Sequence, residues 1–296
     1  MPEVSMPAIF FAADGISLRG QKSMLLWSRV RFIGLLMAAI SGALSWSVDR
    51  FELFGGTASV GFLMALWAEL VILRLRPERR WYDGRAIAES IKTLVWRYSV
   101  GGEPFSVSVP QSEAIKLFAI RVRSLLQEFG KGLGEPIHGA VTNASMETVR
   151  TLPFEVRREV YIKARVAGQT EWYSERGDFH RRSVARWRYL LVLGEVAALF
   201  LAALRFSGVL YIDFAGILAA AVSAGAAWIG IRQHESLSAA YSVAAQELSI
   251  SSSLLSVTTE GEWSTAVSDT ERAISREHTT WLASRTGIDV QADKSS

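Results

Sequence analysis

Two glutamates lie inside long apolar stretches of this sequence, where a charged side chain needs a chemical reason. Glu69 belongs to the apolar segment 53–73, and Glu195 belongs to the apolar segment 189–204. A carboxylate surrounded by hydrocarbon costs several kcal/mol unless it is paired, neutral or hydrated. The two glutamates are therefore the candidate polar residues of a membrane-spanning or pore-lining region.

Two explanations fit these carboxylates, and the sequence leaves both open. In the first, Glu69 pairs with Arg74 or Arg76 near the end of its segment. Glu195 likewise pairs with Arg188. In the second, one or both glutamates face a water-filled path in an oligomer, where a ring of carboxylates favours cations.

Small residues recur at helical spacing in the apolar segment 209–231. Gly216, Ala220 and Ala224 lie four residues apart, and Gly225 lies on an adjoining face. Small side chains at this spacing let two helix backbones approach closely, which is how spans associate inside a membrane. The partner helix is either the neighbouring span of the same chain or a span of another subunit. A weaker version of the pattern occurs in the segment 53–73, at Gly55, Gly56, Gly61 and Ala65.

The residue types that carry catalysis or hold metals are too scattered to form a recognisable motif. The chain has no cysteine, which removes thiolate nucleophiles and thiolate metal sites. No stretch has the spacing of a triphosphate-binding loop, and no two histidines have metalloprotease spacing. The histidines are far apart in sequence, at His138, His180, His234 and His278. We therefore expect no enzyme activity, no metal and no cofactor.

Four apolar segments are long enough to place these residues inside a lipid bilayer. They are 32–48, 53–73, 189–204 and 209–231. At about 1.5 Å of rise per residue, helices of these lengths approach or match the roughly 30 Å hydrocarbon core. Only four residues separate the two members of each pair, so each pair is expected to form an antiparallel hairpin.

Arginines indicate which side of the membrane the connections face. Eleven arginines flank the apolar segments away from the two short turns, and each turn carries one arginine. The eleven are Arg29, Arg31, Arg74, Arg76, Arg79, Arg80, Arg181, Arg182, Arg186, Arg188 and Arg232. Because basic residues are retained on the cytoplasmic side, both turns should face outward, with the middle of the chain and both termini in the cytoplasm. We therefore expect a multi-pass protein of the cell inner membrane. The basic pairs beside the spans favour lipid headgroups over nucleic acid as partners.

Outside the spans, apolar residues follow a helical period that predicts cytoplasmic amphipathic helices. Segments 78–100 and 111–129 follow the first pair of spans, 154–188 leads into the second pair, and 234–255 follows it. The expected fold is an all-α membrane protein with two transmembrane helical hairpins and cytoplasmic amphipathic helices.

A glycine-rich stretch at 130–139 separates two halves that share one plan. Each half has a basic lead-in helix, a pair of spans and an amphipathic helix that emerges from the second span. We assign the units 1–134 and 135–296. The interpretation is a tandem duplication of one two-span unit, and the alternative is chance recurrence of a plan open to any protein with an even number of spans.

The first amphipathic helix carries a family resemblance. Residues 81–98, followed by 101–105, resemble the signature after the first hairpin in SLATT proteins, the two-span effectors associated with SMODS nucleotidyltransferases and SLOG nucleotide sensors in bacterial conflict systems. The residues that carry this signature are Trp81, Arg85, Glu89, Lys92, Trp96, Arg97 and Pro104. Trp172 and Tyr173 before the third span, and 277–281 near the end, are similar to further elements of the group. The resemblance covers roughly the whole chain in a tandem, four-span form.

What the resemblance implies is an anti-phage membrane effector. Such a protein would form a homo-oligomer and breach the bilayer once a cytoplasmic partner senses infection or generates a nucleotide signal. The competing interpretation is a membrane-anchored scaffold that recruits a cytoplasmic partner without any conductance, and a membrane enzyme ranks below both. The sequence leaves open the oligomer number, the activating ligand, and whether the lesion is a selective channel or gross disruption.

Overall fold

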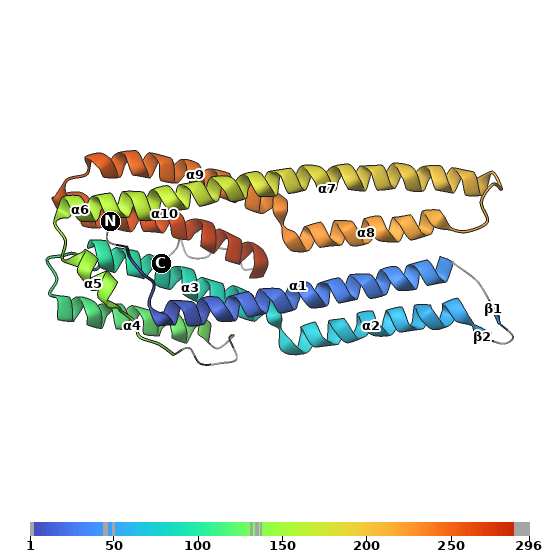
Figure 1. Cartoon of the computed structure of the whole chain (residues 1–296), viewed down its shortest axis with the longest axis horizontal. Helices are drawn as coiled ribbons and strands as arrows, with labels where there is room; N and C mark the ends of the chain where they lie inside the picture. The colour runs from blue at the N-terminus through green and yellow to red at the C-terminus, as the bar shows by residue number, and fades with distance from the viewer. Residues whose placement is uncertain are drawn as a thin grey trace, which may run out of the picture. The chain divides into compact units, whose positions relative to one another are not determined.

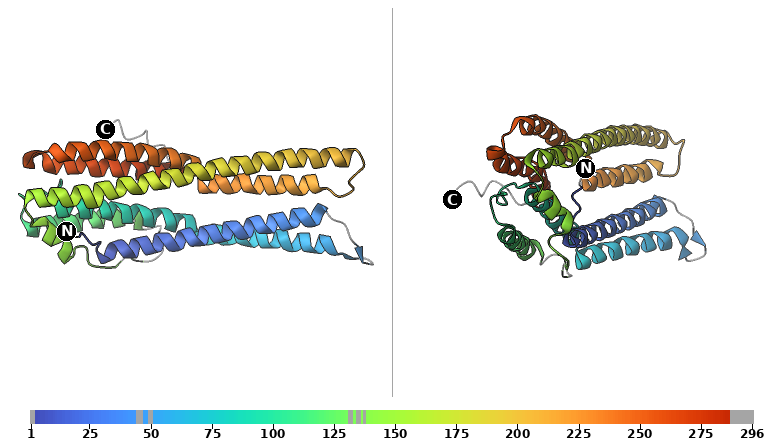
Figure 2. Two further views of the ribbon diagram at one scale, coloured as in Figure 1. Left: turned by 45° about the horizontal axis from the view of Figure 1, so that its top comes forward. Right: turned by 60° about the vertical axis from the view of Figure 1, so that its left-hand side comes forward.

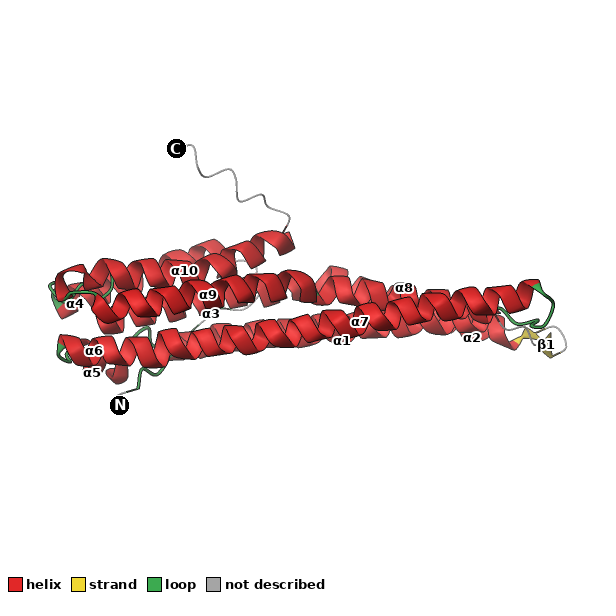
Figure 3. Cartoon of the chain, turned by 90° about the horizontal axis from the view of Figure 1, so that it is seen from above, coloured by secondary structure: helices red, strands yellow, loops and turns green. Residues whose placement is uncertain are grey.

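The computed structural model describes residues 3–43, 47–48, 51–130, 133, 136 and 138–286, and nearly all of them are helical (Figure 1, Figure 3). The elements of the first half are α1 (Ala8–Ala43), β1 (Ser47–Val48), β2 (Phe51–Glu52), α2 (Leu53–Leu75), α3 (Pro77–Val100), α4 (Gln111–Phe129) and α5 (Ala144–Arg150). Those of the second half are α6 (Phe154–Val160), the π-helical segment η2 (Tyr161–Ala167), α7 (Gly168–Phe206), α8 (Phe214–Arg232), α9 (His234–Val257) and α10 (Glu260–Thr286). Among the described residues, four helical stretches are long and apolar enough to cross a membrane. The predicted class, an all-α membrane protein, is confirmed.

The chain divides into two compact units that are not successive halves of the sequence. One comprises Lys22–Pro77 and Phe179–Ser236, and because it contains all four predicted spans we call it the span unit. The other comprises Met1–Gln21, Glu78–Asp178 and Leu237–Ser296, and we call it the core unit. The predicted amphipathic helices 78–100 and 111–129 coincide with α3 and α4 and belong to the core unit.

Within the span unit, α1 and α2 lie side by side (Figure 1, Figure 2). Their closest approach is at Gly34 and Gly61, where a Cβ added to either glycine would lie 2.6 Å from the carbonyl oxygen of the other. The hydroxyl of Thr57 on α2 donates to Ser41 Oγ on α1 at 2.8 Å. Backbones this close require residues without side chains, as in other tightly packed membrane helices.

Helices α7 and α8 of the same unit approach each other through different residues. A Cβ added to Gly194 would lie 2.6 Å from Val222, and one added to Gly225 would lie 3.4 Å from Leu191. The two pairs of helices also meet within this unit, since the rings of Phe32 and Trp228 lie 6.2 Å apart.

The boundaries of two predicted spans differ from those of the helices. The span 32–48 was expected to stay helical to its end, but α1 stops at Ala43 and Ser47–Val48 pairs with Phe51–Glu52 as a short antiparallel ladder. β-Branched and aromatic residues such as Val48 and Phe51 favour strand pairing. At the other end α1 begins at Ala8, so this helix is much longer than the predicted span.

The fourth predicted span, 209–231, begins later than expected. Helix α8 starts at Phe214, and residues 207–213 form the connection from α7 in place of the expected four-residue turn. The reason is local: the Asp213 carboxylate accepts a hydrogen bond from the Gly216 N–H at 3.0 Å and caps the helix there.

The second span of each half ends in the same way. Arg76 follows α2 with φ of 43°, and Gln233 follows α8 with φ of 47°. Each donates its N–H to the carbonyl four residues earlier, on Ile72 and Ile229 respectively, at 2.9 Å. A left-handed residue at this position ends one helix and redirects the chain into the next, α3 or α9.

The core unit is built around the apolar stripes predicted on α3 and α4. Ile91, Val95 and Tyr98 of α3 are fully buried, and so are Phe118 and Val122 of α4. Apolar residues spaced three and four apart form one face of a helix, and burying that face stabilises the unit.

Buried donors close the C-terminal end of α3. Arg150 donates to the carbonyl of Tyr98 at 3.0 Å and to three carbonyls of the loop that leads to α4. Arg157 and Trp263 each donate to the carbonyl of Val100 at 2.8 Å. The last carbonyls of a helix lack partners within the helix, so these side chains satisfy groups that burial would otherwise penalise.

Candidate functional site

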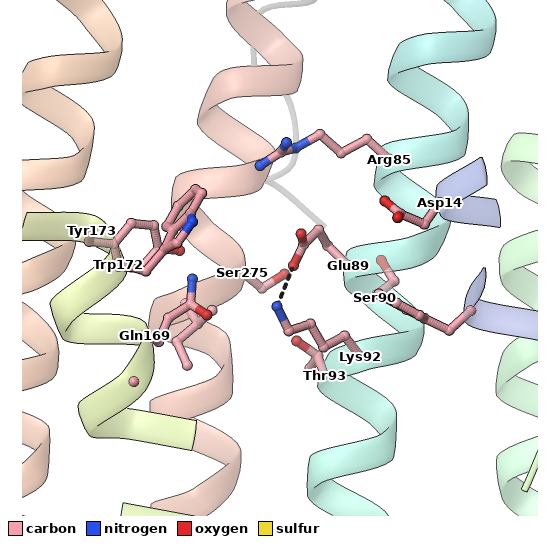
Figure 4. A pocket seen from close by; sticks show the side chains of 13 residues that line it. Asp14, Arg85, Glu89, Ser90, Lys92, Thr93, Gln169, Trp172, Tyr173 and Ser275 are labelled. Carbon is pink, nitrogen blue, oxygen red and sulfur yellow. Dashed lines mark ion pairs between the residues drawn. The ribbon is translucent and has the colours of Figure 1, made fainter. Parts of the chain in front are cut away.

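The core unit contains a cavity of about 360 Å³ lined by four helices (Figure 4). Its charged side chains come from α1 and α3, and its hydroxyl, amide and aromatic groups come from α1, α3, α7 and α10. The charged members are Asp14, Arg85, Glu89 and Lys92, the other polar members include Ser90, Thr93, Gln169 and Ser275, and the aromatic members are Phe10, Trp172 and Tyr173. This cavity brings charged, hydroxyl, amide and aromatic side chains together in one place.

Helix α3 presents the charged wall of the cavity. Arg85, Glu89 and Lys92 are spaced four and three residues apart, so they share one helix face and point into the same space (Figure 4). The Lys92 ammonium lies 3.8 Å from the Glu89 carboxylate, which is an ion pair without a hydrogen bond. Among the side chains that the structure describes, none accepts a hydrogen bond from this ammonium.

Burial lowers the pKa of Lys92 below its usual 10.5, and the nearby Arg165 and Arg85 lower it further, while Glu89 and Glu271 oppose the shift. The ammonium is thus partly desolvated and incompletely paired. An added anion would stabilise the charged form of Lys92.

A fully paired charge cluster lies next to this wall. Arg165 donates from Nε to Glu271 Oε1 at 2.9 Å and from Nη2 to Oε2 at 2.8 Å, and both side chains are almost inaccessible to solvent. Tyr161 donates its hydroxyl to Glu271 Oε1 at 3.0 Å. Burial raises the pKa of Tyr161 well above 10.0, and the Glu271 carboxylate raises it further. These buried groups satisfy one another, so we assign them a structural role.

The aromatic wall is held in place from behind. Trp172 packs edge-on against Tyr173 and Tyr241, with ring centroids 5.3 and 5.4 Å away. The guanidinium of Arg176 lies 5.8 Å from the centroid of the Trp172 indole. These contacts fix the orientation of the indole at the cavity.

The structure brings together five of the nine residues that the family resemblance singled out. Arg85, Glu89, Lys92, Trp172 and Tyr173 line the one cavity, although the two motifs are about 80 residues apart in sequence. Their functional roles remain predictions.

The other four signature residues lie outside this cavity. The Trp81 carbonyl accepts a hydrogen bond from Ser17, the Trp96 ring lies 6.0 Å from that of Tyr161, and Arg97 donates to the carbonyl of Ser268. Pro104 follows a cis peptide bond in the loop between α3 and α4. The sequence did not indicate Asp14, Gln169 and Ser275. They belong to no recognised motif, and only the packing of the helices places them at the cavity.

In the span unit, Glu69 has a different partner from those expected. Its carboxylate accepts a hydrogen bond from Arg31 of α1 at 2.5 Å. The expected partners were Arg74 and Arg76, which follow Glu69 in the sequence. The pair joins α1 to α2 and neutralises the Glu69 charge within the unit.

Glu195 contrasts with Glu69. It is exposed on α7, and no described residue forms a hydrogen bond or ion pair with it. Its expected partner Arg188 instead pairs with Glu235 at 2.8 Å.

The small residues predicted to pack helices occupy several environments. Gly225 faces Leu191 and Trp187 of α7, whereas Gly216 lies beside the Asp213 carboxylate that caps α8. A packing role for Ala220 and Ala224 remains a prediction.

Two of the scattered histidines meet in the structure. His180 Nδ1 lies 2.7 Å from His234 Nδ1, although the two residues are 54 positions apart. Among the described residues, no group of three or more histidines and carboxylates is placed to hold a metal ion.

In the part of the chain that the structure describes, four long apolar helices define a multi-pass α-helical membrane protein. Residues 7–158 match the model of the SMODS and SLOG-associating 2TM effector domain 3, and residues 161–281 match that of the SMODS and SLOG-associating 2TM effector domain 1. The chain therefore belongs to the SLATT family, with two such domains in tandem, as its signature residues predicted. No curated protein and no solved structure matches this chain. The two matches meet between residues 158 and 161, and the boundary placed at 134 remains a prediction.

Proposed function

We propose that this protein is a bacterial membrane effector that forms homo-oligomers and opens a pore in the inner membrane, or disrupts it, in a nucleotide-signalled anti-phage system. Membership of a family of two-transmembrane effector domains supports the effector role. The trigger would come from a separate cytoplasmic protein that generates or senses a nucleotide. The observation that carries the pore is the environment of Glu195.

Glu195 lies on a surface of α7 that is apolar and uncovered within the chain. Leu193, Val196 and Leu199 around it are 52%, 60% and 73% exposed, and no residue in the apolar windows of the third and fourth candidate spans is buried. Lipid or other copies of the chain must therefore cover these helices.

A carboxylate on such a surface is costly in lipid and stable beside water. If α7 faces lipid on every side, Glu195 meets hydrocarbon without a partner. If copies of α7 surround a water-filled path, the same side chain is hydrated and forms a ring with its equivalents. A ring of carboxylates favours cations, so the pore would be cation-preferring.

The first pair of spans is a poorer candidate for the lining. Its carboxylate Glu69 is already paired with Arg31, which removes the net charge from that position. We therefore assign the lining to α7 and the packing support to α1 and α2.

The test is the conductance of the purified protein in planar bilayers, with Glu195→Gln as the informative variant. We expect the wild-type protein to conduct cations in preference to anions, and the Glu195→Gln protein to lose that preference by at least about threefold. The matched control is Glu128→Gln, which removes the same charge from an exposed position of α4 in the core unit.

Two results would favour the membrane-anchored scaffold instead. One is an inserted protein that passes no current when its activating partner is present. The other is retained growth arrest after both pairs of spans are replaced by unrelated transmembrane hairpins, because a scaffold needs its spans only as anchors.

A further inference from the structure

The cavity of the core unit has no part in the pore proposed above, and its size suits a small organic molecule. Its volume of about 360 Å³ falls in the range of small-molecule sites, roughly 300–1,000 Å³. Side chains from α1, α3, α7 and α10 converge on it (Figure 4). Several of them are polar groups that a purely structural cavity would not need.

The first of these groups is a pair of cations on α3. Arg85 and Lys92 are seven residues apart and both line the cavity. The Lys92 side chain is partly buried, with 27% of its surface exposed, and its ammonium has only the 3.8 Å pair with Glu89. A partly buried, incompletely paired cation beside a cavity marks a site where a ligand can supply the missing charge.

Hydroxyl groups accompany the cations. Ser90 and Thr93 of α3 and Ser275 of α10 also line the cavity, with Ser275 next to Glu89 (Figure 4). Two cations with several hydroxyl donors match a phosphate group, which has three oxygens to share, better than they match a single carboxylate.

The opposite wall suits a flat ring. Trp172 is held by its contacts with Tyr173 and Tyr241, so its indole is positioned before any ligand arrives. A fixed indole is a stacking surface for a heteroaromatic ring. The carboxylates of Asp14 and Glu89 add acceptors for amino or hydroxyl groups on such a ligand.

From these groups we infer that the cavity binds a ring-bearing organic phosphate of about mononucleotide size, with its phosphate at Lys92 and Arg85 and its ring at Trp172. The inference concerns binding by the resting protein and does not rest on the pore.

The experiment is isothermal titration calorimetry of the full-length protein in detergent with adenosine 5′-monophosphate, inorganic phosphate and adenosine. We expect the monophosphate to bind at least about tenfold more tightly than either fragment, because only it engages both walls. Lys92→Gln should weaken its binding at least about tenfold. Trp172→Leu should weaken binding of the monophosphate by about fivefold or more. It should leave the affinity for inorganic phosphate unchanged.

The matched control is Lys116→Gln, which removes the same charge from an exposed position of α4 outside the cavity and should leave binding unchanged. Folding is checked by the melting temperature. Because burial disfavours the Lys92 ammonium, Lys92→Gln should melt at the same temperature as the wild-type protein or above it.

Three results would overturn the inference. The first is no binding of the monophosphate at millimolar concentration to a folded wild-type protein. The second is equal affinity of the wild-type and Lys92→Gln proteins for the monophosphate. The third is inorganic phosphate binding as tightly as the monophosphate, which would mean that the aromatic wall takes no part.

Discussion

At the scale of single residues, the core unit holds a fully buried ion pair and a partly exposed ion pair. Arg165 and Glu271 form two hydrogen bonds to each other and have almost no exposed surface, so each satisfies the other. Lys92 has only a long ion pair with Glu89. The Arg165–Glu271 pair stabilises the fold, whereas the Lys92–Glu89 pair leaves part of the Lys92 charge for a ligand. Stability measurements test the first role, and binding measurements test the second.

The fully paired charge gives a stability prediction. Arg165→Met should destabilise the protein by about 3–5 kcal/mol, because it leaves the Glu271 carboxylate buried without a partner. The double variant Arg165→Met/Glu271→Leu should recover most of the loss, since both charges are then absent. Thermal unfolding in detergent, followed by circular dichroism, measures both.

The control for this prediction lies on the same helix as Glu271. Arg272 pairs with Asp269, and both side chains are more than 60% exposed. Arg272→Met should therefore change stability by no more than about 1 kcal/mol. A loss as large as that of Arg165→Met would show that any arginine replacement near α10 is damaging and that the buried pair is not special.

At the scale of elements, the packing of α1 on α2 depends on two glycines. Gly34 and Gly61 bring the backbones so close that a methyl group on either would meet a carbonyl oxygen. The sequence singled out the four-residue spacing in the fourth span more strongly than Gly61 and Ala65. Which small residues form the closest contact depends on how each pair of helices crosses, and a single helix does not reveal that.

Cysteine cross-linking tests this contact directly, because the natural chain contains no cysteine. The hydroxyls of Ser41 and Thr57 are 2.8 Å apart, so Ser41→Cys/Thr57→Cys should form a disulfide readily. Adding Gly61→Val should reduce the disulfide yield several-fold by separating the helices. Adding Gly56→Val, on the same helix but with nothing within 4 Å, should leave the yield unchanged. Equal yields in the two triple variants would contradict the proposed close approach.

At the scale of the whole molecule, the two units differ in the kind of sequence that they contain. The four predicted spans fall in the span unit, and the residues next to both chain ends fall with α3 and α4 in the core unit. Helices α1 and α7 each contribute residues to both units without a break. The arginine distribution predicts that the core unit lies on the cytoplasmic side, and this orientation remains a prediction.

The sidedness follows as a labelling prediction with two matched serines. Ser207 is exposed in the connection between α7 and α8, and Ser108 is exposed in the loop between α3 and α4. A membrane-impermeant thiol reagent added to cells with a permeable outer envelope should label Ser207→Cys at once. It should label Ser108→Cys only after the inner membrane is opened. The reverse pattern, or labelling of both in closed membranes, would contradict the orientation.

The sequence by itself determined the class of this protein, the family and the course of α3 and α4. These features depend on composition, on short-range periodicity and on local signature residues, which a linear sequence displays in full. Only the tertiary structure decided that Glu69 pairs with Arg31, that Arg165 pairs with Glu271, and that two motifs about 80 residues apart line one cavity. The physical reason is that these contacts join helices through their packing angles and axial positions, which many distant side chains set together.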